Sequence, residues 1–441
     1  MFFRRNLSDL SKWRHQRKRK PLVFRGARQV GKSTLVKEFA KLEKLNLIEI
    51  NLETTSLPSL KTEEIKVSAI IKDIQLLINR KVSQDTDLIF FDEIQRSPQA
   101  FMALRYFYEE YPQLAIVAAG SLLDFLLESP GISVPVGRIE YYYLGPVSFS
   151  EYLLAKNKNQ ILEEFNNSPD KISEMGHKLL IQEWRSFLIT GGMPECVQAE
   201  IDQADVFDIR KIQKNILNTY RSDFFKYTKG AQPIRCEAVF NYLPGHIGQK
   251  VKYSEIDSEE KSKNLKEAIH LLHQARILLP TIHTNATSIP LKAVSDDHVF
   301  KLYHLDCGLV SAELLIMNDF SKESPMRGSL NEQFVAQHLA YLNPTEDPQL
   351  FYWLKDKSSQ KAEIDFIHTL RTKKLPEIIP IEVKSNRKAK ARSISELTKI
   401  NPAIKRWIKL SPDPYRKITN DRVMYEVPIY LVERLDAILS N

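Results

Sequence analysis

The chain has 441 residues, of which 43% are hydrophobic, and this length predicts about two to four globular domains. It has no apolar stretch long enough to cross a bilayer, and residues 1–20 lack the apolar core of a secretory signal. We therefore expect a cytoplasmic protein that makes no membrane contact. The cysteines Cys196, Cys236 and Cys307 are far apart, which argues against a disulfide framework or a cysteine metal site and predicts small core residues.

The net charge of +8 is concentrated locally, in residues 14–20 and 385–393. Basic segments of this kind favour a nucleic-acid or acidic partner, although solvated basic faces have the same composition. Charge alone therefore leaves the partner open.

Residues 22–39, LVFRGARQVGKSTLVKEF, predict a buried strand, a glycine-rich loop and an amphipathic helix. The spacing G-x-x-x-x-G-K-S lets several backbone N–H groups point at one anion, which predicts a phosphate-binding loop. Lys32 would reach the β- and γ-phosphates, and Ser33 would give its hydroxyl to Mg²⁺ at the positive end of the helix dipole. The alternative is a glycine turn followed by chance by Lys-Ser. The expected nucleotide-binding residues are Gly26, Ala27, Arg28, Gln29, Val30, Gly31, Lys32, Ser33 and Thr34.

A second segment, DTDLIFFDEIQ at 85–95, supplies the acids that such a loop needs. Leu88 to Phe91 form an apolar run typical of a buried parallel strand, and Asp92 follows at its end. Asp92 would hold the hydration shell of Mg²⁺ opposite Ser33, and Glu93 is the candidate base that orients the attacking water. The alternative for this Asp-Glu pair is a helix N-cap.

The next strand, at 114–119, ends at Gly120-Ser121. Ser121 is a candidate contact to the γ-phosphate or the lytic water, and its alternative role is that of a simple helix cap. Arg138 is a candidate for stabilising charge that develops on the phosphate, and Arg96 is its rival. An ordinary surface arginine is the alternative for both.

The middle of the chain predicts helices over residues 160–230, then two more helices and two strand-like pieces, LLPTIH and IPLKAV. Two helices followed by a β-ribbon are the order of a winged helix, a module that often places a basic helix in a DNA groove. The candidate second helix also carries Glu259, Glu260 and Glu267, so its charge favours DNA no more than a packing role.

The C-terminal third combines a helix at 328–342 with three strands. Alternation on the strands brings Asp365 near Glu382 and Lys384, and the helix supplies Glu332 upstream. This arrangement can hold one or two Mg²⁺ ions, with Asp365 and Glu382 as ligands, and can activate water against a phosphodiester. It resembles the PD-(D/E)xK restriction-endonuclease-like fold. A solvated sheet face on which Asp365 pairs with Lys384 is the alternative.

The segments GARQVGKS, FFDEIQ, AAGS and GRIEYYYLGPVSFSEYL resemble the prokaryotic AAA+ superfamily ATPases that carry a C-terminal domain of unknown function. The resemblance extends to FLITGGMPE and LYHLDCGLV, and so covers nearly the whole chain. It implies that Lys32 and Ser33 match the Walker A motif, that Asp92 and Glu93 match Walker B, and that Ser121 is at the first sensor position. It also implies that an arginine from a neighbouring subunit can complete the site, and thus a homo-oligomer.

We therefore predict an α/β chain with an AAA+ P-loop domain at 1–158, a helical and winged-helix-like region at 159–295 and an endonuclease-like domain at 296–441. The expected function is that of an ATP- and Mg²⁺-dependent ATPase coupled to a nuclease-like domain that acts on DNA. The alternative is a nucleotide-driven switch whose C-terminal domain binds protein or nucleic acid without cleavage. GTP is the minor alternative to ATP.

Overall fold

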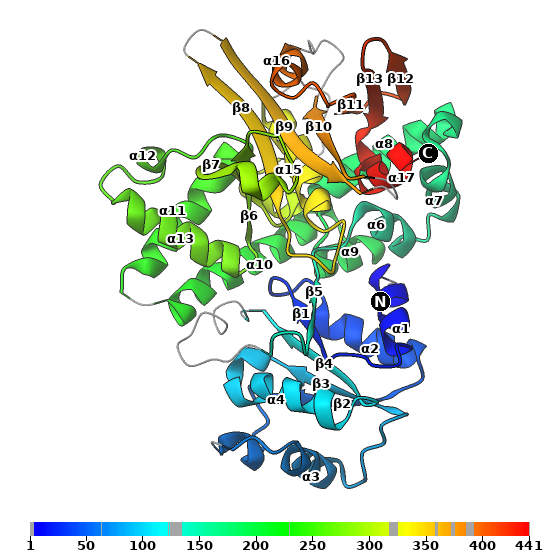
Figure 1. Cartoon of the computed structure of the whole chain (residues 1–441), viewed down its shortest axis with the longest axis vertical. Helices are drawn as coiled ribbons and strands as arrows, with labels where there is room; N and C mark the ends of the chain where they lie inside the picture. The colour runs from blue at the N-terminus through cyan, green and yellow to red at the C-terminus, as the bar shows by residue number, and fades with distance from the viewer. Residues whose placement is uncertain are drawn as a thin grey trace.

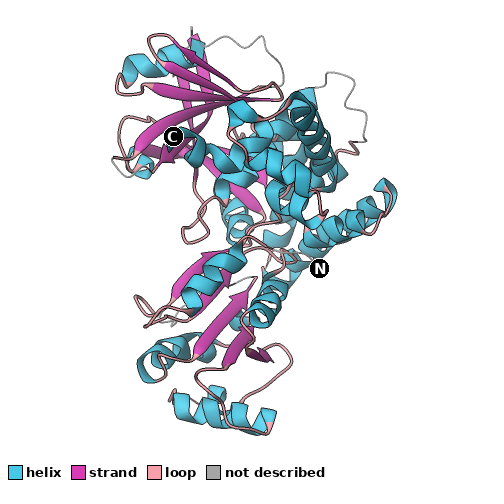
Figure 2. Ribbon diagram, turned by 90° about the vertical axis from the view of Figure 1, so that its right-hand side faces the viewer, coloured by secondary structure: helices cyan, strands magenta, loops and turns pink. Residues whose placement is uncertain are grey.

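The computed structural model describes residues 4–62, 64–121, 123, 135–228, 230–316, 325–357, 360–371, 375–384 and 392–440. Most of the helix expected at 122–127, the turn at 372–374 and most of the basic segment 385–393 lie outside these residues. Two β-sheets occupy opposite ends of the molecule, with most of the helices between them (Figure 1). The turned view shows the same separation of the strands (Figure 2).

The N-terminal sheet has five parallel strands in the order β2-β3-β4-β1-β5. Its inner strands are apolar and buried on both faces, as expected for parallel strands covered by helices. The strands predicted at Leu22 to Arg25 and Leu88 to Phe91 are confirmed. The bounds are β1 Leu22–Arg25, β2 Asn46–Asn51, β3 Asp87–Asp92, β4 Ala115–Gly120 and β5 Glu140–Tyr143.

Helices cover both faces of this sheet. Apolar residues of α1 and α2 pack with Phe24 and Phe90 on one face, and those of α3 and α4 pack with Ile89 and Phe91 on the other. The phosphate loop therefore joins a buried strand to a buried helix, which fixes both of its ends. The bounds are α1 Asn6–Arg14, α2 Lys32–Leu42, α3 Val67–Ile78 and α4 Pro98–Glu110, with the short 3₁₀ helices η1 Pro58–Lys61 and η2 Ile94–Arg96.

A helical region follows, as predicted. Its apolar residues belong to the same continuous core that contains one face of the N-terminal sheet and helix α15 (Pro325–Ala340), so the two ends of the molecule share one core. The bounds are α6 Phe149–Ala155, α7 Asn159–Asn166, α8 Glu174–Thr190, α9 Pro194–Ile201, α10 Val206–Tyr227, α11 Gln232–Tyr242, α12 Tyr253–Ile256, α13 Ser262–Gln274 and α14 Cys307–Glu313, with η3 Pro169–Lys171 and η4 Leu243–His246.

The C-terminal sheet is mixed and has eight strands in the order β12-β13-β11-β10-β9-β8-β6-β7. Strand β6, which precedes residue 296, pairs antiparallel with β7 and parallel with β8, so the sheet extends across the expected domain limit. The bounds are β6 Leu278–Thr284, β7 Ser295–His304, β8 Leu350–Lys357, β9 Gln360–Leu370, β10 Glu377–Val383, β11 Arg406–Ser411, β12 Arg416–Thr419 and β13 Val423–Pro428.

One strand prediction is wrong. The segment IPLKAV forms the 3₁₀ helix η5, Leu291–Val294, and the ribbon partner of β6 is β7. Pro290 has no N–H group to donate to a ladder, which disfavours strand pairing at this point.

Two helices lie on opposite faces of the C-terminal sheet. Phe334 of α15 shares a core cluster with Ile381 of β10, whereas Leu397 of α16 packs in a separate cluster with Trp353 and Ile364. The three cysteines are buried and free, as predicted. Among the described residues, no helix combines the length and the apolar character needed to cross a membrane. The remaining helices are α15 Pro325–Ala340, α16 Arg392–Ile400, η6 Ile429–Arg434 and α17 Leu435–Ser440.

Candidate functional site

The phosphate loop lies at the carboxyl end of β1 and leads directly into α2. Gly31 has φ 93°, a left-handed conformation that favours glycine. A Cβ atom on Gly26 would lie 2.2 Å from the carbonyl oxygen of Leu144. The two glycines are therefore required by backbone conformation and by close packing.

The Lys32 amine lies inside the loop. Its Nζ donates to the carbonyl oxygens of Gly26 at 2.9 Å and Ala27 at 2.8 Å. Burial lowers the pKa of Lys32 to about 8, and the nearby carboxylates of Glu93 and Asp92 oppose this shift. A phosphate group would offer this desolvated amine the full counter-charge that two carbonyl groups do not supply.

Ser33 and Asp92 meet where α2 begins and β3 ends. The Ser33 hydroxyl donates to Asp92 Oδ2 at 2.8 Å, and burial raises the pKa of Asp92. A hydroxyl and a carboxylate at this distance are oxygen ligands of the type that Mg²⁺ uses beside a triphosphate.

Glu93 directly follows Asp92 and has a left-handed backbone, with φ 52°. Its side chain makes no capping hydrogen bond with η2 and instead accepts from the Gln95 side chain at 2.5 Å. The N-cap interpretation of this acid therefore does not hold. Glu93 lines a cavity that opens beside the phosphate loop.

A cavity of about 640 Å³ opens beside the loop and is large enough for a nucleotide. The cavity also reaches Asp92, Glu93 and Ser121, so three separate strand ends meet at one site. The expected loop residues that line it are Arg28, Gln29, Gly31, Lys32, Ser33 and Thr34. Gly26, Ala27 and Val30 do not line it, because the side chains of Ala27 and Val30 are buried in the core.

Helix α10 holds the loop from the helical region. The Arg28 guanidinium contacts both carboxylate oxygens of Asp223 at 2.8 and 3.0 Å, and the Tyr220 hydroxyl donates to the Arg28 carbonyl oxygen at 2.9 Å. Sequence reasoning missed Asp223 and Tyr220, since nothing in an amphipathic helix shows which distant loop it will meet.

Helices α1 and α9 also contribute residues that line the cavity, and the sequence did not predict them. Leu7 faces the cavity from α1, and Pro194, Glu195 and Gln198 face it from α9. The GGMPE segment, singled out only by family resemblance, was the one signal for α9.

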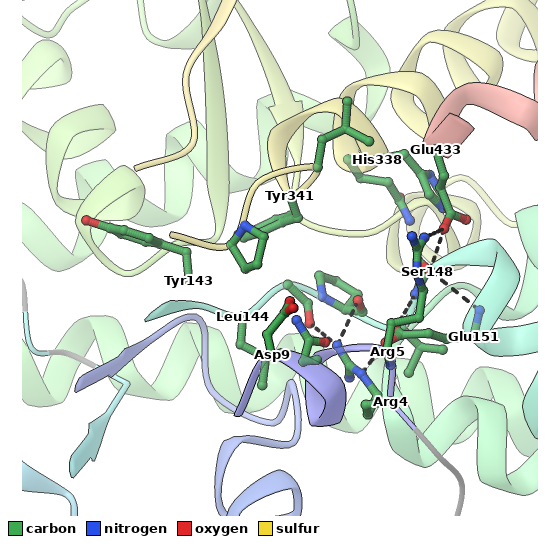
Figure 3. A pocket seen from close by; sticks show the side chains of 17 residues that line it. Arg4, Arg5, Asp9, Tyr143, Leu144, Ser148, Glu151, His338, Tyr341 and Glu433 are labelled. Atoms are coloured by element: carbon green, nitrogen blue, oxygen red, sulfur yellow. Dashed lines mark hydrogen bonds and ion pairs between the residues drawn. The ribbon is translucent and has the colours of Figure 1, made fainter. Parts of the chain in front are cut away.

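Arg4 fastens the N-terminal segment to the phosphate loop. Its guanidinium donates to the carbonyl oxygens of Val30 at 3.2 Å and Gly145 at 3.0 Å, and it pairs with Glu151 at 3.1 Å. Figure 3 shows Arg4 beside Glu151, with Glu433 of the C-terminal region close by. The Arg4 side chain is buried, so these contacts take the place of its hydrogen bonds to water.

A second pocket, drawn in Figure 3, lies between α6, η6 and α15. Glu433 accepts from the Ser150 N–H at 2.9 Å and the Ser148 hydroxyl at 2.8 Å, and lies 3.6 Å from His338 Nε2. Burial lowers the pKa of His338, opposed by the charge of Glu433. Glu151 also accepts from the Ser148 N–H at 2.9 Å, so together with the Arg4–Val30 hydrogen bond these contacts connect the phosphate loop to α15, the helix that carries Glu332. Figure 3 shows the part of this path from Arg4 to His338.

The structure places the two candidate arginines differently from the expectation. Arg138 precedes β5, at the amino end of a parallel strand, whereas the phosphate loop follows the carboxyl end of β1. It pairs with Glu109 at 2.9 Å and does not line the cavity, so within one chain the expected phosphate contact is wrong. Arg96 lies in η2 near Glu93 and pairs with Glu53 at 2.7 Å.

The C-terminal candidates come together as the alternation predicted. Lys384 Nζ lies 3.6 Å from Asp365 Oδ2 and 3.7 Å from Glu382 Oε2. Asp365 also accepts from the Val383 N–H at 2.7 Å. Glu332 of α15 is close enough to Asp365 for the two charges to interact. We call Glu332, Glu363, Asp365 and Glu382 the acidic cluster.

Burial dominates the electrostatics of the acidic cluster. It raises the pKa of Glu332 to about 8, with a further increase from the Asp365 charge, and it raises the pKa of Glu382 to about 6. The Tyr303 hydroxyl donates to Glu332 at 3.0 Å. Across the described ranges, no group of three or more His, Cys, Asp or Glu side chains is arranged to hold a metal ion.

Three segments of the chain match models of known protein families. Residues 18–153 match the family model of an AAA domain, residues 181–319 match a domain of unknown function (DUF8612), and residues 327–430 match another domain of unknown function (DUF4143). The N-terminal part of the chain is thus an AAA domain, and the phosphate loop, both acids and Ser121 lie within it. An AAA domain implies the activity of a P-loop nucleoside triphosphatase.

Two individual proteins are similar. An uncharacterized protein of Methanocaldococcus jannaschii is 25% identical over 200 residues, which are 43% of this chain and 41% of that protein. The matched region thus spans about two fifths of that curated relative. A structure of the ORC2 protein of Aeropyrum pernix, in ADPNP and ADP complexes, covers 71% of this chain and 94% of its own at 10% identity and a TM-score of 0.34.

Proposed function

We propose that the protein is a Mg²⁺-dependent ATPase. The observation that carries the proposal is the meeting of Lys32, the Ser33–Asp92 pair and Glu93 at one cavity of about 640 Å³. Lys32 would neutralise the β- and γ-phosphates, and Ser33 with Asp92 would hold Mg²⁺. Glu93 would orient the attacking water, and Ser121 would contact the γ-phosphate or that water. The Mg²⁺ ion would offset charge on the triphosphate oxygens.

Phosphate release from ATP and GTP tests this proposal. Purified full-length protein is expected to hydrolyse ATP with Mg²⁺ and to lose that activity with excess EDTA. A competition titration with both nucleotides decides the base preference. Absence of nucleotide-stimulated phosphate release under all of these conditions would reject the ATPase assignment.

Completion of the site by a second copy of the chain is a further part of the proposal. It is supported by the position of Arg138. This residue lies at the amino ends of the parallel strands, whereas the cavity of its own chain lies at their carboxyl ends. An arginine from a neighbour would then contact the developing phosphate charge. Specific ATPase activity that rises with protein concentration is expected, and activity independent of concentration would argue against this part.

For the C-terminal third we propose an endonuclease-like domain that acts on DNA under the control of the ATPase. The convergence of Asp365, Glu382, Lys384 and Glu332 supports this, since a carboxylate pair beside a lysine can bind a divalent ion and water. Plasmid cleavage with Mg²⁺ or Mn²⁺, with Asp365→Ala as the control, tests it. Cleavage that is unchanged in Asp365→Ala would remove the acidic cluster from the mechanism.

The second candidate is an ATP-driven switch whose C-terminal domain binds a protein or nucleic acid without cutting. The observation that favours it is the buried amine of Lys301, which pairs with Glu363 within the acidic cluster. This candidate predicts ATP-dependent binding of DNA or protein and no cleavage with any metal. We also propose three domains with the limits 1–158, 159–295 and 296–441, of which the second contains the winged-helix-like module. Limited proteolysis would test these limits. A cytoplasmic location is a further proposal, and cell fractionation would test it.

A further inference from the structure

Lys301 places a positive charge inside the acidic cluster. Its side chain is 1% exposed, and its Nζ forms an ion pair with Glu363. The charges of Glu332 and Asp365 also act on this amine. Sequence analysis did not identify Lys301 or Glu363, because the lysine belongs to a strand that precedes the helix and strands of the cluster.

The topology of the sheet brings the amine to this place. Lys301 lies on β7, the edge strand, opposite Thr281 of β6, and Lys250 forms a bridge on its other side. Its amine lies 5.0 Å from the centre of the Tyr352 ring on β8, and so reaches across the neighbouring strands toward β9. The apolar stem of a lysine can cover such a distance while its charge stays with the acids.

Other contacts close the cluster from the same side. Tyr303, two residues further along β7, donates its hydroxyl to Glu332 at 3.0 Å. A Cβ atom on Gly248 would lie 2.3 Å from Glu332 Oε2, so the chain after η4 packs directly against this carboxylate. Glu332 is therefore enclosed by Tyr303 and the chain at Gly248, whereas Glu363 of the same cluster is 40% exposed.

Two amines of the chain offset part of the negative charge of the four carboxyl groups. Lys301 pairs with Glu363 and interacts electrostatically with Glu332 and Asp365, and Lys384 lies beside Asp365 and Glu382. In a metal-dependent site, a divalent cation supplies this positive charge. Among the residues that the structure describes, none donates a hydrogen bond to the buried Glu382 Oε1, so acceptor capacity remains inside the cluster.

We propose that the Lys301 amine is a built-in counter-ion that occupies the acidic cluster in place of a divalent cation. The cluster then takes a metal ion only when the amine is removed or withdrawn. This inference rests on the second candidate function, the ATP-driven switch whose C-terminal domain does not cut, and it states what excludes a divalent cation from the acidic cluster: the buried amine of Lys301.

Binding of Mn²⁺ to the full-length chain, followed by electron paramagnetic resonance without nucleotide, tests the inference. All proteins carry Asp92→Asn, so that the nucleotide site does not contribute. The protein with Lys301 intact is expected to show no Mn²⁺ binding that depends on Asp365. Lys301→Gln is expected to show Asp365-dependent Mn²⁺ binding with an affinity at least about tenfold above the detection limit of the assay, a ratio equal to about 1.4 kcal/mol. Adding Asp365→Asn is expected to abolish this binding.

Lys301→Arg is the matched control, because it keeps the charge and should exclude the ion as the lysine does. A melting curve for each variant verifies that it is folded. Should Lys301→Gln not fold, Lys301→Met, which keeps the length of the stem, replaces it. A folded neutral variant that gains no Mn²⁺ binding would overturn the inference, and so would Asp365-dependent binding in the protein with Lys301 intact.

Plasmid cleavage by the same variants, with Asp92 retained, separates this inference from the nuclease proposal. Mn²⁺ binding by Lys301→Gln together with Asp365-dependent cutting supports both. Mn²⁺ binding without cutting supports the counter-ion and rejects the nuclease. Asp365-dependent cutting by the unaltered protein supports the nuclease and overturns the counter-ion.

Discussion

The nucleotide site and the acidic cluster both combine buried lysines with carboxylates, yet they differ in what satisfies the lysine. Lys32 is held by two carbonyl oxygens and faces a cavity of about 640 Å³. Lys301 is held by a carboxylate and is enclosed. A lysine that contacts only neutral acceptors retains charge for an incoming anion, whereas one paired with an acid does not. Two features therefore distinguish the nucleotide site from the acidic cluster. The first is whether the buried amine faces an open cavity, and the second is whether its hydrogen-bond partners are neutral or charged.

Glu93→Gln gives the largest expected effect and tests the open site. The amide keeps the shape of the side chain but cannot act as a base, so ATP turnover should fall by about a thousandfold while ATP stays bound. Phosphate release and nucleotide binding are measured on the same sample. Glu49→Gln on β2 is the control, because Glu49 pairs with Lys37 and does not line the cavity. A turnover rate equal to that of the unaltered protein would contradict the role of Glu93.

Lys32→Ala should weaken ATP binding by about a hundredfold, since a buried charge-assisted contact to phosphate is lost. The measurement is a fluorescence titration with a labelled ATP analogue. Lys37→Ala is the matched control on the same helix, where the lysine is 44% exposed and pairs with Glu49. Equal affinity in Lys32→Ala and Lys37→Ala would disprove the phosphate-loop assignment.

Arg4→Ala should raise the KM for ATP by about tenfold, because one charge-assisted hydrogen bond to the loop backbone is worth roughly 1.5 kcal/mol. It should also lower the free energy of unfolding by about 3 kcal/mol, since the buried Glu151 loses its guanidinium. Lys12→Ala is the comparison, because the Lys12 side chain is 77% exposed and its ion pair with Asp9, which is 44% exposed, is worth less than about 1 kcal/mol. Urea unfolding and ATPase kinetics measure both effects, and equal losses in the two variants would contradict the bracing role of Arg4.

His304→Gln gives the smallest expected effect and sharpens the contrast with Lys301. Burial lowers the pKa of His304 to about 3, whereas the acids near Lys301 raise the pKa of that amine. The unfolded chain therefore takes up a proton below about pH 6.5 that the folded chain does not, and stability is full above that pH and falls as the pH falls.

Urea midpoints at pH 7 and pH 5 measure this contribution. The unaltered protein should lose about 2 kcal/mol more than His304→Gln over this interval. The exposed His298 on the same strand serves as the control, and His298→Gln should keep the full pH dependence. A His304→Gln protein with unchanged pH dependence would show that His304 is not the responsible group.

Local sequence patterns predicted the elements that carry the nucleotide site. The glycine spacing of the loop is a backbone requirement that the structure shows at Gly26 and Gly31, and the apolar run before Asp92 marks a buried parallel strand. Period-two alternation likewise placed Asp365 beside Lys384 on neighbouring strands. The loop, the buried strand and the position of Asp365 depend on residues nearby in the chain or on the pairing of two strands, so short sequence patterns can predict them.

Contacts between distant segments were not predictable in this way. Arg4, Asp223 and Lys301 reach their sites through packing of whole elements, and no short pattern marks them. The error on Arg138 is more instructive. Arg138 precedes β5 and so lies at the amino ends of the parallel strands, whereas the phosphate loop follows the carboxyl end of the neighbouring strand β1. Topology alone therefore argues against a contact between Arg138 and a phosphate bound in the same chain.

The measurement that tests the central comparison most directly is the number of Mn²⁺ ions bound per chain by the unaltered protein, with and without a non-hydrolysable ATP analogue. The account predicts one tightly bound ion when the analogue is present, lost in Asp92→Asn, and no ion that depends on Asp365 under either condition. A bound ion that Asp365→Asn removes would contradict the account, because the acidic cluster would then be an open metal site.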